Sequence, residues 1–248
     1  MASPAAPEPK LHQAALAWWR EQRQQNGLSK SLRALVSELW GFVRDSTPEQ
    51  RRRRYGDVEY DWDYRVDTTS ATVGWRDRLL GVFHSPYQPT EPALFHEMLH
   101  ALAVDFAGVT FVDLGSGKGR TLLMAAEYPF RRIIGVELLP ALHQAACENV
   151  RKYLSERQQC CVLEVRCGDA KQFAFPDEPL VLYLFNPLPE AGLALVIRNL
   201  ETSLREHPRK VFVLYHNPLL EHLFSASPLL KRVSGTHQYS VYESEPIA

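Results

Sequence analysis

Residues 113–119 are Asp113-Leu114-Gly115-Ser116-Gly117-Lys118-Gly119, preceded by the apolar pair Phe111-Val112 and followed by a helix-favouring run from Arg120. This order predicts a strand, a tight turn and a helix. Because glycine lacks a Cβ, such a turn lets a ligand lie close to the backbone, over the N–H groups at the start of the helix. The segment therefore predicts a site for a nucleotide-type ligand.

The spacing of the glycines separates the nucleotide classes that use such turns. A dinucleotide fingerprint requires G-x-G-x-x-G, but here the third glycine comes one position early and Arg120 takes its place. A phosphate-binding P-loop requires Gly-Lys followed by Ser or Thr, whereas Lys118 is followed by Gly119. Neither pattern fits, which leaves the motif D-x-G-x-G-x-G.

That motif resembles the class I methyltransferases, in which an acidic residue ends the first strand and the glycines pass under S-adenosylmethionine. Because this cofactor carries an ammonium group and a sulfonium, a carboxylate such as Asp113 is favourable beside it, whereas a pyrophosphate would be repelled. The resemblance covers about Tyr87 to Tyr242. It implies that the following loop residues contact the cofactor: Asp113, Gly115, Ser116, Gly117, Gly119 and Arg120.

Further polar residues are expected at the ends of the next two strands. Glu137 ends the second strand, where the resemblance implies hydrogen bonds to ribose hydroxyls. Asp169 and Ala170 follow the third strand, and the resemblance implies that they meet the adenine; taken alone, Asp169 is typical of a turn or cap. Since open α/β sheets bind ligands at the carboxyl ends of their strands, Asp113, Glu137 and Asp169 together indicate an S-adenosylmethionine site.

The alternation of helical and strand patterns predicts an α/β fold, a Rossmann-like, doubly wound and mainly parallel sheet. The resemblance implies seven strands, one of them antiparallel near the C-terminus, and residues 230–234 and 239–243 are expected to form a closing hairpin. The expected strands are 110–114, 132–137, 161–167, 180–185 and 210–215, and the expected helices are 93–106, 120–128, 140–157, 191–206 and 219–225.

Residues 1–86 are predicted to form a flexible tail and a helical cap that contributes to the acceptor pocket, while residues 87–248 form the catalytic domain. Two helices are expected between Leu11 and Val43. The run Arg51–Arg54 gives way to the acidic, aromatic Tyr55–Tyr64, which is typical of a solvated loop or of internal charge pairing. Residues 64–68 resemble segments that precede the glycine loop in bacterial methyltransferases and are placed near the acceptor.

The methyl acceptor is expected at the ends of the fourth and fifth strands. Many amino-directed methyltransferases carry Asn or Asp, two prolines and an aromatic there; this chain keeps Asn186-Pro187 but continues with Leu188-Pro189. Asn186 is therefore either the residue that holds the acceptor nitrogen and the cofactor, or a strand-ending turn. His216 is a candidate proton acceptor or a structural histidine.

Residues 85–90 precede the helix that leads into the first strand. They resemble the Tyr-x-Pro-Thr segment of the non-SET histone-lysine methyltransferases, which folds over the cofactor. The resemblance makes Tyr87 and Thr90 candidates for cofactor contact, with Tyr87 also positioning the acceptor. The alternative is a proline-rich linker.

A competing motif is His96-Glu97-Met98-Leu99-His100, an H-E-x-x-H in which two histidines one turn apart bind zinc. The metzincin extension is missing, and Glu127 is the one candidate for a third ligand. An amphipathic helix covering the sheet explains the same residues without metal. A zinc peptidase is thus the alternative enzyme, and a non-catalytic nucleoside-binding module is a third hypothesis.

Composition limits the partners. The formal net charge of -1 makes nucleic acid an unlikely partner, which leaves a protein side chain or a small molecule as the acceptor, with N-methylation favoured. The four cysteines show no metal or disulfide spacing, which indicates a cytoplasmic protein with no bound metal. No apolar run approaches the roughly 20 residues that span a bilayer.

Overall fold

The computed structural model describes residues 12–13, 15–16, 18–20, 23–24, 28, 30–33, 35–36, 58–69, 88–186 and 188–244. The described residues between 12 and 36 are helical, which agrees with the helices predicted there. The arginine run 51–54 lies outside the described residues.

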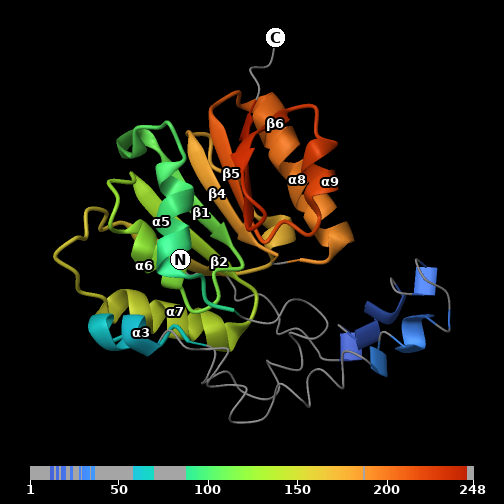
Figure 1. Cartoon of the computed structure of the whole chain (residues 1–248), viewed down its shortest axis with the longest axis horizontal. Coiled ribbons are helices and arrows are strands. Elements are labelled where there is room, and N and C mark those ends of the chain that lie inside the picture. Colours follow the sequence, from blue (N-terminus) through green and yellow to red (C-terminus); the bar gives the residue numbers. More distant parts are fainter. Residues whose placement is uncertain are drawn as a thin grey trace.

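A seven-stranded sheet forms the centre of the described chain (Figure 1). Its strands lie in the order β3-β2-β1-β4-β5-β7-β6. Strands β1 to β5 are parallel to one another, and β7 is antiparallel to both β5 and β6, so the predicted topology and the closing hairpin are confirmed. The strands are β1 (Thr110–Leu114), β2 (Arg132–Glu137), β3 (Leu163–Cys167), β4 (Leu180–Phe185), β5 (Val211–His216), β6 (Leu230–Gly235) and β7 (Tyr239–Ser244).

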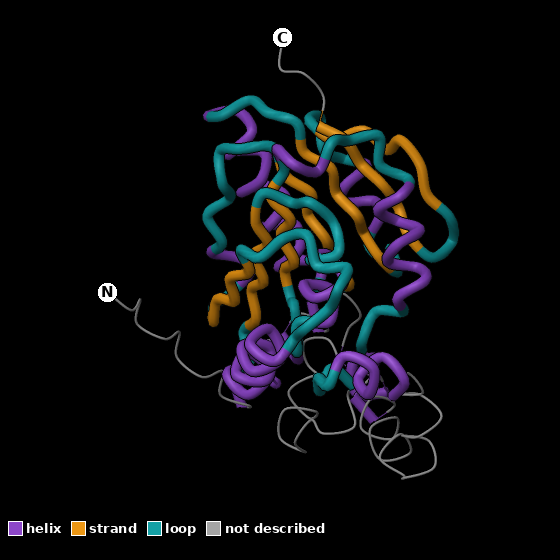
Figure 2. The backbone as a smooth tube through the Cα atoms, turned by 90° about the vertical axis from the view of Figure 1, so that its left-hand side faces the viewer, coloured by secondary structure: helices purple, strands orange, loops and turns teal. Residues whose placement is uncertain are grey.

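Helices pack against both faces of the sheet, because side chains alternate along each buried strand. On β1, Phe111 belongs to the apolar cluster on one face and Val112 to the cluster on the other. Figures 1 and 2 show the strands between the two groups of helices. The first face carries α3 (Val58–Tyr64), α5 (Pro92–His100), α6 (Arg120–Ala125) and α7 (Pro140–Lys152), and the second carries α8 (Glu190–Glu206) and α9 (Glu221–Ser225).

Several predicted boundaries were wrong. The helix predicted over 93–106 ends at His100, and a separate 3₁₀ turn, capped by the Asp105 side chain, covers Phe106–Gly108. The helix predicted over 140–157 ends at Lys152, because Tyr153 is extended and buried in the core. Smaller shifts affect other ends: α6 stops at Ala125, α8 starts at Glu190, α9 starts at Glu221, β3 starts at Leu163, and β5 covers Val211–His216.

The solvated loop predicted over 55–64 was also wrong where the structure describes it. Val58–Tyr64 forms α3, and the Tyr60 side chain is buried against the first apolar cluster. A helix of only seven residues cannot be distinguished from a loop by charge pattern alone.

Two smaller observations concern the chain as a whole. No helix in the described residues is long and apolar enough to cross a bilayer. The thiols of Cys147, Cys160, Cys161 and Cys167 are free.

Candidate cofactor and acceptor site

The glycine loop between β1 and α6 has the backbone shape that its sequence requires. Gly115, Gly117 and Gly119 have φ values of 90°, 54° and 83°, in the left-handed region that favours glycine. A Cβ at Gly119 would lie 3.3 Å from the Cβ of Ala146 on α7. All three glycines are therefore needed for the turn, and the loop stays close to the backbone of the neighbouring helix.

Asp113 lies on β1 at the start of this loop, and its carboxylate is 2% exposed. The Thr121 hydroxyl of α6 donates a hydrogen bond to Asp113 Oδ2. Burial raises the pKa of the Asp113 carboxyl to about 7; the Thr121 hydroxyl opposes this shift and the Glu137 carboxylate adds to it. A buried carboxylate of this kind favours a cationic ligand. The site therefore fits the ammonium and sulfonium groups of S-adenosylmethionine.

Glu137 ends β2 and holds the loop from the other side. Its Oε2 accepts a hydrogen bond of 2.8 Å from Gly117 N, and its Oε1 accepts one of 2.8 Å from Leu139 N. A carboxylate has about four lone-pair positions, so these bonds leave room for hydroxyl donors. Its role in holding a ribose stays a prediction.

Ser116 and Gly135 fit together behind the loop. The Ser116 hydroxyl is buried and has no hydrogen-bond partner among the described residues. A Cβ at Gly135 on β2 would lie 2.8 Å from Ser116 Oγ and 2.5 Å from Leu122 Cδ1. Glycine at position 135 is therefore what allows Ser116 and α6 to approach the sheet.

Asp169 and Ala170 follow β3 at the same edge of the sheet. Asp169 caps the short helix Ala170–Gln172: its Oδ1 accepts from Lys171 N at 3.0 Å, and its Oδ2 lies 3.2 Å from Lys171 Nζ. The cap interpretation of Asp169 is therefore correct. Its contact with adenine, and that of the buried Ala170, stay predictions.

A chain of buried hydrogen bonds lies at the ends of β4 and β5. Thr90 Oγ1 is 2.7 Å from the Tyr183 hydroxyl, which is 2.8 Å from His216 Nδ1. The Phe185 ring stacks on the imidazole, with centroids 3.8 Å apart. Burial lowers the pKa of His216 to about 4, so the imidazole is neutral at physiological pH. Tyr87, the other predicted residue of this segment, lies outside the described residues.

Asn186 ends β4 with a left-handed backbone, at φ 43°. Its Oδ1 accepts a hydrogen bond of 2.7 Å from the Tyr215 hydroxyl, and its Nδ2 donates one of 2.6 Å to the carbonyl of Asn217. Asn217, after β5, is also left-handed, at φ 50°. The side-chain amide of Asn186 thus joins the ends of two strands, and its predicted contact with the acceptor is untested.

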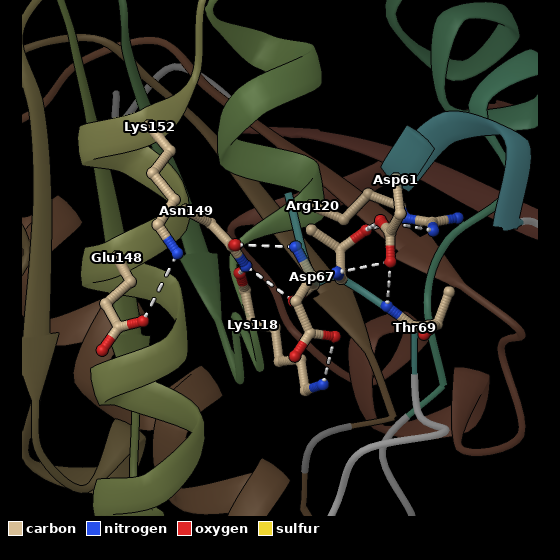
Figure 3. Close-up of polar contacts among 9 residues, drawn as sticks. Asp61, Asp67, Thr69, Lys118, Arg120, Glu148, Asn149 and Lys152 are labelled. Atoms are coloured by element: carbon tan, nitrogen blue, oxygen red, sulfur yellow. Dashed lines mark hydrogen bonds and ion pairs between the residues drawn. The ribbon is translucent and has the colours of Figure 1, made fainter. Parts of the chain in front are cut away.

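Helix α3 and the residues that follow it, up to Thr69, dock on the glycine loop (Figure 3). We call residues 58–69 the strap. Lys118 Nζ lies 2.8 Å from Asp67 Oδ1, and Arg120 Nη2 lies 3.4 Å from Asp61 Oδ1. Arg120 Nε also donates to Thr68 Oγ1 at 2.7 Å. Residues 64–68, expected beside the acceptor, therefore contact the cofactor loop, and the Arg120 side chain is turned towards them.

The H-E-x-x-H residues do not assemble as a metal site. His96 Nδ1 lies 2.8 Å and His100 Nε2 3.4 Å from the Tyr128 hydroxyl, while Glu97 Oε1 accepts from the Tyr239 hydroxyl on β7. Glu127 is 3.9 Å from His96 Nε2. No group of three or more metal-binding side chains occurs within the described ranges. The motif acts as the amphipathic helix that was the alternative explanation.

Sequence reasoning missed Tyr183, Thr121, Asp61 and Asp67. Tyr183 lies in an apolar strand, so its sequence context predicts a core residue. Only the hydrogen bonds of its hydroxyl group to Thr90 and His216 distinguish it from its apolar neighbours. Thr121 is the second residue of α6, where its hydroxyl faces Asp113 on β1. Asp61 and Asp67 lie more than 50 residues before the cations that they contact. The mixed acidic and aromatic pattern of the strap was the available signal.

Part of the chain matches a known family model. Residues 112–186 match the family model described as methyltransferase domain. No curated protein matches the sequence.

Solved structures with a similar chain path include three methylating or predicted methylating proteins. An RNA methyltransferase from Salinibacter ruber, in complex with S-adenosyl-L-homocysteine, is 23% identical and matches over 63% of this chain and 92% of its own, with a TM-score of 0.43. A predicted N6-adenine-specific DNA methylase from Listeria monocytogenes is 15% identical over 64% and 52%, with a TM-score of 0.48. A putative methyltransferase from Escherichia coli is 15% identical over 64% and 89%, with a TM-score of 0.46.

Proposed function

We propose that this chain, which carries a class I S-adenosylmethionine-dependent methyltransferase domain, transfers the methyl group to an amine nitrogen of a protein side chain or of a small molecule. S-adenosylmethionine, when bound, supplies an electrophilic methyl group on its sulfonium. The observation that carries the proposal is the position of His216 and Phe185 on the same sheet face and edge as Asp113.

The chain's own residues favour an amine over a phosphate-bearing acceptor. Both cations of the glycine loop are buried and lie in ion pairs with strap carboxylates, so they are not presented to a phosphate backbone. The end of β4 and β5 instead offers a neutral imidazole and an aromatic ring. A neutral imidazole can accept a hydrogen bond from an amine N–H, and an aromatic ring can pack against a cationic or alkylated nitrogen, whereas neither group attracts a phosphate.

In the proposed transfer, Asp113 and Glu137 hold the cofactor, while Asn186 and the Tyr87 segment position the acceptor nitrogen in line with the methyl group. The nitrogen lone pair forms the new N–C bond as the S–C bond breaks. The proton of the nitrogen leaves to solvent, and the neutral His216 orients the nitrogen by accepting a hydrogen bond from its N–H at Nε2, while Nδ1 stays bonded to Tyr183. A reduced, cytoplasmic setting is part of the same proposal.

The experiment is methyl transfer from labelled S-adenosylmethionine into a cell extract that is then separated into protein, small-molecule and RNA fractions. We expect label in the protein or small-molecule fraction, stable to base as N-methyl groups are, and its loss with Asp113→Asn. Label mainly in RNA would refute the amine proposal. Binding of the cofactor without transfer to any fraction would instead support the non-catalytic module.

A further inference from the structure

One amide side chain on α7 joins the strap to the glycine loop, as Figure 3 shows. The Asn149 side chain is 2% exposed. Its Oδ1 accepts a hydrogen bond of 2.8 Å from Asp67 N, and its Nδ2 donates to Asp67 O at 2.7 Å and to Lys118 O at 2.9 Å. Both amide hydrogens are used, so the N–H and C=O of one strap residue are held together with a carbonyl of the loop.

The glycine loop relies on bonds from neighbouring elements to keep its shape. Gly115, Gly117 and Gly119 are all left-handed, and glycine has more conformational freedom to lose than any other residue. The carbonyl that Asn149 bonds lies between the second and third of these glycines. Ala146, three residues earlier on α7, is the residue that a Cβ at Gly119 would meet at 3.3 Å. One face of α7 therefore supports the loop.

The amides of the last strap residues report whether the strap is docked. Asp67 N donates to Asn149 Oδ1, while Thr68 N and Thr69 N donate to Asp61 Oδ2 at 2.8 Å and 2.9 Å. A strap that leaves the loop exposes the Asp67 amide to water and frees the next two residues to open. Hydrogen exchange at these amides therefore measures docking.

We infer that Asn149 is a positioning residue for the cofactor, which couples docking of the strap to occupation of the glycine loop. The bonds to Asp67 and to Lys118 O come from one amide, so a ligand that fixes the loop also favours the docked strap. Because such coupling is reciprocal, docking raises the cofactor affinity by the same factor by which the cofactor favours docking. The inference rests on S-adenosylmethionine being the cofactor that occupies the loop.

The test follows hydrogen exchange of the Asp67, Thr68 and Thr69 amides by NMR, with and without saturating S-adenosylhomocysteine, which binds without turnover. We expect the ligand to slow exchange at these amides about fivefold or more. The reference is Ala107 N, which also donates to an aspartate side chain, Asp105 Oδ1 at 3.1 Å, but in the turn before β1, at the opposite edge of the sheet. Its exchange should change less than about twofold.

Two variants remove the coupling amide. Asn149→Ala truncates the side chain, and Asn149→Leu keeps nearly the same size and shape without the three hydrogen bonds. In both, the Kd for S-adenosylhomocysteine should rise about three- to tenfold, because the loop is less preorganised. The slowing of exchange that the ligand causes at Thr68 and Thr69 should fall below about twofold. The matched control is Val196→Ala, which truncates a buried side chain of α8 on the other face and should keep both the Kd and the slowing.

The outcomes separate this inference from the cofactor assignment. If S-adenosylhomocysteine binds the unmodified chain but leaves exchange in the strap unchanged, the inference alone is overturned. It is also overturned if Asn149→Leu keeps the full slowing, or if Val196→Ala loses as much of it, since overall stability would then explain the effect. If neither S-adenosylhomocysteine nor S-adenosylmethionine binds the unmodified chain, the cofactor assignment fails and the inference fails with it.

Discussion

Asp113→Asn is expected to weaken the binding of S-adenosylmethionine at least tenfold, about 1.4 kcal/mol, and at the same time to stabilise the free protein. The loss of affinity follows from removing the buried negative charge that favours the cofactor's cationic end. The gain in stability follows from the raised pKa of about 7, which shows that ionising this carboxyl is unfavourable in the fold.

The pH dependence of the free energy of unfolding follows from the same raised pKa of Asp113. Because the folded-state pKa lies above the unfolded value, the folded state binds the extra proton between about pH 4 and pH 7. This contribution to stability is complete below the unfolded pKa and is lost as the pH rises through 7. Urea unfolding should therefore show Asp113→Asn to be more stable than the unmodified chain at pH 8 by at least ~1 kcal/mol, with a smaller difference at pH 5.

The affinity for S-adenosylmethionine should increase with pH, whereas the contribution of Asp113 to stability decreases. In the unmodified chain the Kd for S-adenosylmethionine should fall between pH 5 and pH 8, as Asp113 ionises, and this part of the pH dependence should disappear in Asp113→Asn. The comparison of the two proteins cancels any titration of the cofactor itself. A variant that is less stable at pH 8 and binds the cofactor as before would mean that Asp113 is a structural residue.

His216→Asn is expected to lower kcat about tenfold, because the hydrogen bond proposed to orient the acceptor nitrogen is lost. The asparagine amide reproduces the position of Nδ1, so the bond to Tyr183 is kept, while the Nε2 atom is lost. The Kd for the cofactor should change less than about twofold, since His216 is proposed to contact the acceptor and not the cofactor. Turnover of the labelled acceptor fraction and calorimetry together measure both quantities.

A control and a pH profile sharpen this prediction. His207→Ala removes an exposed histidine that lies 3.6 Å from Asp177, between α8 and the amino end of β5 and thus at the opposite edge of the sheet from His216, and should leave kcat unchanged. Since burial lowers the pKa of His216 to about 4, kcat should show no histidine step between pH 6 and pH 7. If His216→Asn keeps full kcat, the histidine is structural.

The fold could be predicted where local pattern and packing agree. The glycine loop, the first strands and the closing hairpin are each specified by residues that are neighbours in sequence, such as Asp113 and Gly119. Helix ends were less predictable: α7 ends where Tyr153 becomes extended and packs in the apolar core, a contact that no local pattern records. The cofactor edge followed from strand order alone, since carboxyl ends of parallel strands meet.

The contacts that refine the site could not be predicted in this way. Asp67 and Lys118 are 51 residues apart, and their pairing depends on how the strap crosses α7. The Tyr183 hydroxyl reaches Thr90 and His216 only once β4 and β5 are paired. Asn186 differs from these residues, because its sequence motif did mark it as a site residue. What the motif did not reveal is that its side-chain amide also bonds Tyr215 and Asn217 and so joins the ends of β4 and β5.

The most direct measurement is calorimetry of the unmodified chain with S-adenosylmethionine and, separately, with S-adenosylhomocysteine. The carboxylates at Asp113 and Glu137 and the three left-handed glycines predict binding of both ligands with Kd values in the micromolar range. Absence of heat and of thermal stabilisation with either ligand, at concentrations well above micromolar, would mean that the glycine loop has been assigned to the wrong cofactor.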